Sequence, residues 1–257
     1  VIGNSNLQVS LDGNNQTTVS PTNPNWYGSE TLVFKVTDNS VNAFFDTDTA
    51  TFTIEPLDHV PNITNIPNQT IGLFGSFLPF DLDFYLQEQD GDEVEWSFEF
   101  ITNPRGNSAP SWSVNPAQYQ FSMNVTAEII SRNQTVTNGN YVLGAYVGNE
   151  LRGVTQSVQA GSDWMFFITI YSNTSGEIVH FKLFDAALQD ILPVKEELTF
   201  APNGVFGEPL SPYQMRAGNI LLSINQLNEM NFEIVDTSWT GSETIQFRVR
   251  DANRSHH

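Results

Sequence analysis

The chain has 257 residues, with 10 Lys and Arg against 29 Asp and Glu, so its net charge at pH 7 is −19. Such a charge repels phosphate backbones and anionic lipids, and it argues against nucleic-acid binding. The absence of cysteine excludes disulfides, thiolate metal sites and cysteine nucleophiles. No stretch approaches the ~20 apolar residues that span a bilayer, so we expect no membrane insertion.

The two ends of the sequence are expected to reflect a cut at one end and an added tail at the other. Val1 indicates that the sequence starts inside a longer polypeptide. Residues 254–257 (RSHH) resemble the remnant of a purification tag and are set aside.

Residues 1–57 are predicted to form strands and no helix. In SETLVFKVTDN, the apolar residues Leu32, Phe34 and Val36 alternate with more polar neighbours, which predicts a strand half-buried against a core. The Gly28-Ser29 pair supplies a turn before this strand. A further alternating strand follows at Asp46–Pro56.

Residues 58–107 contain a long polar segment, then an acidic loop and a strand. The loop reads EQDGDE and the strand VEWSFEF. Residues 108–215 contain five further strand-like segments, which read YQFSMNVTAEII, YVLGAYVG, WMFFITIYS, IVHFKLFDA and ELTFAP. Helical spacing is limited to one expected turn near Ala186–Leu192. These patterns predict an all-β chain built of sandwiches.

Residues 216–253 repeat the beginning of the chain. The phrase WTGSETIQFRVRDAN starts at Trp239, and WYGSETLVFKVTDN starts at Trp26. Both tryptophans are expected to be core or corner residues. The similarity extends upstream: GNSNLQVSLDG at Gly3–Gly13 matches GNILLSINQLN at Gly218–Asn228, and TTVSP at residues 17–21 corresponds to FEIVD at residues 232–236. The chain therefore contains parts of two copies of one module.

The repeated phrase, with its closing strand DTDTATFTIEP and the loop EQDGDE, resembles the cadherin-like, immunoglobulin-type repeats of bacterial extracellular, adhesin-like proteins. The resemblance implies a partial repeat at residues 1–57 and a second repeat at 58–107 plus 216–253 that lacks its last strand. Residues 108–215 resemble a β-sandwich module of secreted Bacteroidetes-type proteins and would be a domain inserted into the second repeat. An extracellular or cell-surface location is expected.

Calcium is the expected metal, because carboxylates clustered around a glycine turn supply the oxygen ligands that it needs. Glu88, Asp90 and Asp92 form one predicted group, and cadherin-like repeats often use this loop for calcium. A second predicted group joins Asp38, Asp46 and Asp48, with Asp58 in the linker between the repeats. The alternative for each group is a solvated turn whose charges point outward.

Aromatic residues of the inserted segment could stack on sugars. Trp112, Tyr119, Tyr141 and Tyr146 are the candidates for a carbohydrate-binding platform, although aromatic residues in strands are more often part of a core. Trp164 lies in the segment WMFFITIY, which is predicted to be a fully buried strand. No serine–histidine elbow, phosphate loop or HExxH zinc motif is present.

Three functions remain open at this point. The first is a non-catalytic extracellular adhesion module, with calcium-stiffened repeats that display the inserted domain to a cell-surface glycan or protein. The second is a carbohydrate-binding module of a secreted multidomain enzyme. The third is a catalytic β-sandwich in the insert, which would need two facing carboxylates in a cleft. Unpaired strand edges also predict self-association.

Overall fold

A computed structural model describes residues 5–24, 26–55, 59–89 and 93–252, and the described chain is all-β. It divides into two compact units. Unit 1 comprises the described residues up to Val60 together with Gln89, and unit 2 comprises the other described residues. Within these residues, no helix has the length and apolar character needed to cross a membrane.

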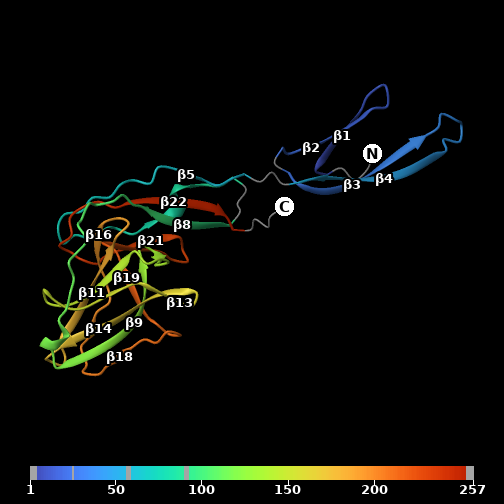
Figure 1. Cartoon of the computed structure of the whole chain (residues 1–257). Coiled ribbons are helices and arrows are strands. Elements are labelled where there is room, and N and C mark those ends of the chain that lie inside the picture. The colour runs from blue at the N-terminus through green and yellow to red at the C-terminus, as the bar shows by residue number, and fades with distance from the viewer. Residues whose placement is uncertain (1–4, 25, 56–58, 90–92, 253–257) are drawn as a thin grey trace. The chain divides into compact units, whose positions relative to one another are not determined.

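Unit 1 consists of two antiparallel hairpins (blue in Figure 1). The first joins β1 (Leu7–Leu11) to β2 (Thr17–Pro21), and the second joins β3 (Gly28–Thr37) to β4 (Phe45–Ile54). Leu7 and Leu32 are the fully buried apolar side chains among its described residues. Each hairpin thus contributes one fully buried apolar side chain.

Unit 2 contains two hydrophobic cores. The first belongs to what we call the host module, the described residues of 61–101 and 218–252. Its elements are β5 (Asn62–Ile63), β6 (Phe80–Asp81), the 3-10 helix η1 (Leu82–Tyr85), β7 (Leu86–Gln87), β8 (Val94–Ile101), β20 (Ile220–Ile224), β21 (Glu229–Ile234) and β22 (Thr244–Asp251). The sheet β20-β21-β6 faces the pair β22-β8 across a core of Leu82, Trp96, Ile220, Leu222 and Met230.

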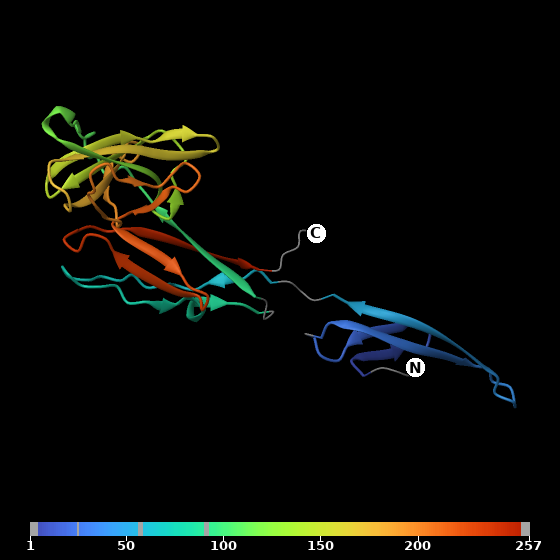
Figure 2. The same cartoon turned by 90° about the horizontal axis from the view of Figure 1, so that it is seen from below.

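The second core belongs to what we call the insert, residues 116–217. Its elements are the 3-10 helix η2 (Pro116–Gln118), β9 (Phe121–Ser131), β10 (Gln134–Thr135), β11 (Tyr141–Val147), β12 (Glu150–Gln156), β13 (Val158–Ala160), β14 (Asp163–Ser172), β15 (Ile178–Asp185), β16 (Asp190–Pro193), β17 (Leu198–Thr199), β18 (Val205–Phe206) and β19 (Tyr213–Ala217). Figure 2 shows these strands as a body beside the host strands β8 and β22.

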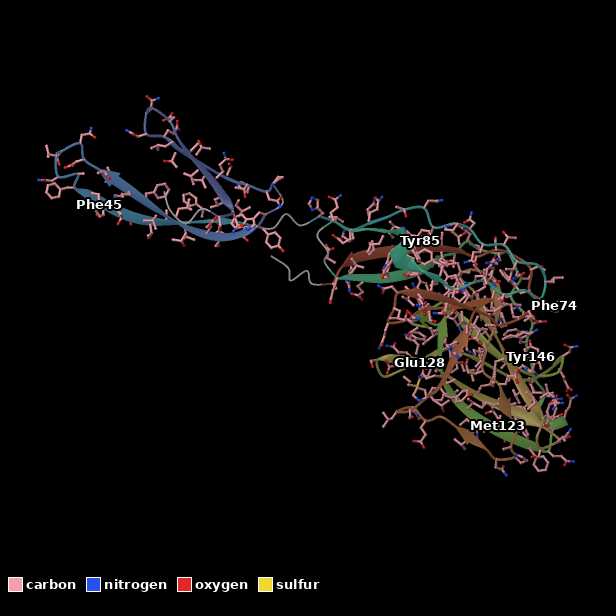
Figure 3. All side chains as sticks on the ribbon, turned by 180° about the vertical axis from the view of Figure 1, so that it is seen from behind. Phe45, Phe74, Tyr85, Met123, Glu128 and Tyr146 are labelled. Carbon is pink, nitrogen blue, oxygen red and sulfur yellow. The ribbon has the colours of Figure 1, made fainter. Side chains whose placement is uncertain are left out.

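The insert is a β-sandwich. One sheet has the order β10-β9-β14-β13, with β18 and β19 running parallel to β9, and the other has the order β12-β11-β15-β16, with β17 paired to β15. The inward side chains include Met123, Phe166, Phe181 and Phe200, each nearly or completely buried. Met123 lies between the strands of this body in Figure 3. At Gly153, a Cβ atom would lie 2.6 Å from the Thr169 carbonyl oxygen, so glycine lets β12 lie against β14.

The two copies of the repeated phrase share their backbone structure with a constant offset of 213 positions (239 − 26). Asn15 and Asn228 both adopt positive φ in the first hairpin turn, at 64° and 56°. The amide of Trp26 donates to the carbonyl of Asn23, and that of Trp239 donates to Asp236. The equivalence therefore extends from the first hairpin into β3 and β22.

This offset corrects the alignment expected upstream of the tryptophans, which was two residues out of register. Thr17–Pro21 corresponds to residues 230–234, and Leu7 corresponds to Ile220, as the hairpin pairs Leu7–Pro21 and Ile220–Ile234 establish. A shift of two residues preserves the alternation of inward and outward side chains, so the hydrophobic pattern alone did not detect it.

Two local expectations for the insert were also wrong. The helical turn expected near Ala186–Leu192 is the hairpin turn between β15 and β16, with Gln189 at a φ of 49°. The strand β14 is not buried on both faces, because Phe167 is 42% exposed.

The sheet of the insert extends beyond the expected boundary at residue 215. Strand β19, which ends at Ala217, pairs with β9.

Candidate functional site

A cluster of charged side chains joins the insert to the host module, and we call it the junction cluster. Its members come from the segment after β8, the turn between β9 and β10, the two ends of the β15–β16 turn, and the residue before β22. They are Arg105, Arg132, Asp185, Asp190 and Glu243.

Arg132 is the central cation of the cluster and is 7% exposed. One guanidinium nitrogen donates to Asp190, and another lies 3.9 Å from a carboxylate oxygen of Asp185. Arg132 and Asn133 have φ values of 47° and 65° and form the two-residue turn that joins β9 to β10. Turns of this kind match the twist of the flanking strands, and here the turn directs Arg132 toward both aspartates.

Arg105 connects the two cores through its side chain and its backbone. Its Nη2 lies 2.7 Å from Glu243 Oε2 in the host module, and its Nε lies 3.2 Å from Asp190 Oδ2 in the insert. Its amide also donates to the carbonyl of Leu188, in the β15–β16 turn. The other oxygen of Glu243 accepts a hydrogen bond of 2.8 Å from Asn219 Nδ2.

Burial makes these contacts important for the orientation of the insert. Asp185 and Asp190 are 2% and 4% exposed, and the side chain of Glu243 is 3% exposed. A buried charge that loses its partner costs about 3–5 kcal/mol, so separating the insert from the host module would be penalised. Burial, together with the neighbouring charge of Asp185, raises the pKa of Tyr141, which also borders this region.

Two neighbouring clefts open beside the junction cluster, between β8 and β20. Asn133 and Leu222 line both of them. The first cleft is also lined by Phe100, Ile130, Arg216, Ile220 and Leu221, and the second by Trp96, Ser97, Phe98, Ser223 and Ile224. Residues of the host module and of the insert thus line both clefts at their boundary.

The predicted calcium ligands fall into two groups. Asp90, Asp92 and Asp58 lie outside the described residues, and Glu88 is described without them. The second group is not brought together: Asp38 accepts hydrogen bonds from Ser40, while Asp46 and Asp48 bond the amides that follow them on β4. No three acidic or histidine side chains in the described ranges converge as a metal site. Calcium binding stays a prediction.

The predicted carbohydrate-binding residues do not form one platform. Trp112 and Tyr146 are in contact, with ring centroids 6.0 Å apart and planes at 79°, and both are half-buried. Lys182 lies 5.2 Å from the centre of the Tyr146 ring. Tyr141 points to the other face of β11, toward the core, and Figure 3 locates Tyr146 within the insert. Trp164 also packs against the core.

Tyr119 belongs to a different cluster, which the sequence patterns did not reveal. Its ring stacks on that of Tyr171 at 6.2 Å and 22°, and the guanidinium carbon of Arg152 lies 5.0 Å from its centre. The Tyr119 hydroxyl donates to Glu150 at 2.6 Å, and this bond raises the pKa of Tyr119 and lowers that of Glu150. We call these four residues the tyrosine cluster.

The residues of both clusters come from distant positions in the chain. Arg105 and Glu243 are brought together only by the fold of the host module, and Tyr119 meets Tyr171 through the end of β14. A charged residue in a strand-rich sequence is ordinarily solvated, so nothing in the sequence distinguished these from surface residues. Comparison with family models, curated proteins and solved structures found no match to this chain.

Proposed function

We propose that this chain is a non-catalytic extracellular segment in which cadherin-like β-sandwich repeats display the insert, at a fixed orientation, to a glycan or protein on a cell surface. The observation that carries this proposal is the junction cluster. Arg105 holds an acid of the insert and an acid of the host module at the same time. A display function requires that kind of fixed attachment.

Two further contacts support a rigid connection. Lys195 of the insert pairs with Glu233 on β21 of the host module. The amide of Gly218 donates to the carbonyl of Pro193, so the chain is hydrogen-bonded where it leaves the insert. Polar domain boundaries ordinarily permit relative motion, and buried ion pairs with backbone bonds oppose it.

Residual dipolar couplings would test the fixed orientation. We expect the backbone amides of the insert and of the host module to report one common alignment tensor. Arg105→Ala should make the two tensors differ, because it breaks both ion pairs. Arg248→Ala is the matched control, since Arg248 pairs with Glu99 inside the host module. Different alignment tensors for the insert and the host module in the unaltered chain would contradict a fixed orientation of the insert.

Recognition itself needs a separate measurement. Beads coated with the chain should adhere to surfaces that carry cell-surface glycans or proteins, and the adhesion should fall when excess soluble chain is added. Absence of adhesion across a broad panel of such surfaces would contradict the proposed recognition function. It would not affect the conclusion that the insert has a fixed orientation on the host module.

The tyrosine cluster supports a second candidate, carbohydrate binding by the insert of a secreted enzyme. Two nearly parallel rings with a neighbouring Arg and Glu offer stacking and hydrogen bonding to a sugar. Affinity electrophoresis in gels that contain neutral polysaccharides should show retardation, and Tyr171→Ala should abolish it. Tyr146→Ala, outside this cluster, is the control. Equal retardation of both variants would count against this candidate.

A further inference from the structure

One sheet of the insert has an outer face on which aromatic and polar side chains alternate. Met123 and Val125 on β9, and Ile168 and Ile170 on β14, are buried in the core of the insert. Because successive residues of a strand point to opposite faces of a sheet, the residues between them point outward. We call these outward residues the β9–β14 face, and they are Ser122, Asn124, Thr126, Phe167, Thr169 and Tyr171.

The register of the two strands arranges the β9–β14 face in three rows. The strands β9 and β14 lie side by side in the insert and pair without a shift over these residues (Figure 1). Each ring on β14 has a hydroxyl group opposite it on β9, and a polar pair lies between the two rings. The opposing pairs are Tyr171 with Ser122, Thr169 with Asn124, and Phe167 with Thr126.

The middle row is polar and accessible. Thr169 Oγ1 donates a hydrogen bond of 2.9 Å to Asn124 Oδ1. Among the hydrogen bonds of the described residues, Asn124 Nδ2 donates none, and the Asn124 side chain is exposed, so this amide nitrogen is available to a ligand. Phe167, beside this row, is 42% exposed.

The tyrosine cluster extends the β9–β14 face at one end. Tyr119 stacks on Tyr171, and Asn173 holds the backbone on both sides of Tyr119, because it accepts from the amide of Gln120 at 2.8 Å and donates to the carbonyl of Gln118 at 3.1 Å. At the other end lies Phe167, four residues from Tyr171 and about 13 Å away along the strand. This distance exceeds the width of one sugar ring.

Charge and polarity indicate what kind of ligand fits. None of the six residues of the β9–β14 face is charged, although the net charge of the chain is −19, so a neutral ligand is favoured over a polyanion. A sugar stacks its apolar C–H face on a ring and bonds polar groups through its hydroxyls. A protein interface ordinarily has a contiguous apolar centre, which the row of Thr169 and Asn124 interrupts here.

We propose that the β9–β14 face binds an extended neutral polysaccharide that lies along β14 from the tyrosine cluster to Phe167. The proposal rests on the second function proposed above, carbohydrate binding by the insert, and it specifies the ligand. One sugar stacks beside Tyr171 and another on Phe167, and the sugars between them bond Asn124. Sugars with mostly equatorial hydroxyls, which expose flat C–H faces, suit this arrangement.

The dependence of affinity on chain length would test the proposal. Isothermal titration calorimetry of the whole chain would use disaccharides and hexasaccharides of neutral β-linked glucans and xylans. A hexasaccharide should bind about tenfold more tightly than the matching disaccharide, because only the longer ligand spans both ring positions. Phe167→Ala should remove this gain and leave the disaccharide affinity unchanged. Tyr171→Ala should weaken the binding of both ligands.

Two further variants serve as controls. Phe167→Tyr retains an aromatic ring at this position and should retain the gain of the hexasaccharide. Ile178→Ala removes a comparable apolar side chain, 46% exposed, from β15 in the other sheet, and it should change neither affinity. An unchanged disaccharide affinity of Phe167→Ala would also show that this variant is folded.

The outcomes separate this proposal from the function on which it rests. If no oligosaccharide binds, carbohydrate binding and the extended face are both overturned. If disaccharide and hexasaccharide bind equally and Phe167→Ala has no effect, the tyrosine cluster still binds sugar, but the extended face is overturned. Tighter binding of an acidic polysaccharide, or self-association in light scattering that Phe167→Ala abolishes, would assign the face to a different partner and overturn the proposal as well.

Discussion

Unit 1 and the host module contain the same strand–turn–strand sequence in two different surroundings. In unit 1, Glu30 accepts hydrogen bonds from the amides of Ser5, Asn6 and Leu7 and fastens one hairpin to the other. Its counterpart Glu243 accepts from Asn219 and Arg105 instead. One glutamate position thus closes a module in unit 1, whereas in the host module it also anchors a second sandwich.

The turns of the two copies are alike although their cores are not. The host module buries five large apolar residues, and unit 1 buries two among the residues described. In both copies a tryptophan ring lies over the glycine two positions later: a Cβ at Gly28 would lie 3.4 Å from Trp26, and one at Gly241 would lie 2.8 Å from Trp239. Local contacts therefore determine the turns, and the surroundings determine how much core forms.

The largest expected difference between the copies comes from the junction cluster. Asp190→Asn removes the shared acid of Arg105 and Arg132, and we expect unit 2 to lose about 3–5 kcal/mol of unfolding free energy. Unit 1 has no such cluster in its described residues and should unfold unchanged. Urea titration followed by hydrogen exchange would separate the units. Arg250→Ala, an exposed ion-pair change, should cost less than about 1 kcal/mol.

The next largest expected difference between the two copies is the effect of calcium on their stability. The predicted loop at residues 88–92 belongs to the segment expected to form the second repeat, whereas Asp38, Asp46 and Asp48 do not converge within the part of the chain that the structure describes. Calcium at 100 times its Kd should stabilise the host module by about 2.7 kcal/mol, and Asp90→Ala or Asp92→Ala should remove the effect. Thermal unfolding with chelator and then with added calcium measures this. An unchanged Tm would leave both acidic groups as solvated turns.

A smaller difference is expected at the matched hairpin turns. Asn228 Nδ2 donates to both carboxylate oxygens of Asp83 at 3.1 Å, and the described contacts include no such bond for Asn15. Glycine tolerates the positive φ of both turns. Asn228→Gly should therefore cost about 1–2 kcal/mol, and Asn15→Gly less than about 0.5 kcal/mol. Equal costs in denaturant titrations would mean that the Asp83 contact contributes nothing.

The smallest effect concerns acid stability. Hydrogen bonds from Ser5, followed by those from Asn6 and Leu7, hold the pKa of Glu30 below the ordinary glutamate value. A depressed pKa in the folded state contributes stability above the unfolded pKa, and this contribution is lost as the pH falls through the folded pKa. Glu30→Gln should flatten the acid side of the stability profile of unit 1. An unaltered profile would assign that slope to other groups.

The strands were predictable from sequence, and the contacts between distant residues were not. Alternation in Leu32, Phe34 and Val36 identified β3, and the repeated phrase identified β22. The same alternation allowed an alignment two residues out of register, which only the pairing of Leu7 with Pro21 resolved. The prediction of an all-β sandwich fold is confirmed.

Sequence patterns predicted the candidate sites less well than they predicted the strands. Trp112 and Tyr146 do meet, but at an angle that offers no shared plane, and Tyr119 pairs with Tyr171 instead. The junction cluster depends on Arg132 in a tight turn and Arg105 in a loop. Such side chains resemble ordinary surface charges until long-range strand pairing places them opposite buried acids.

The way the insert joins the host module has a mechanical consequence. Phe100, near the end of β8, and Ile220, at the start of β20, line the same cleft, so the two connections of the insert leave the host side by side. Tension applied along the host would pass across its own strand ladders and leave the insert unloaded. Once the host opened, tension would reach the insert, and unfolding of the insert would then release roughly 115 residues at about 3.4 Å each, close to 390 Å of stored length. A single extension step of that size in force spectroscopy, after the step of the host module, would show that the contour length of the insert is protected from force until the host module has unfolded.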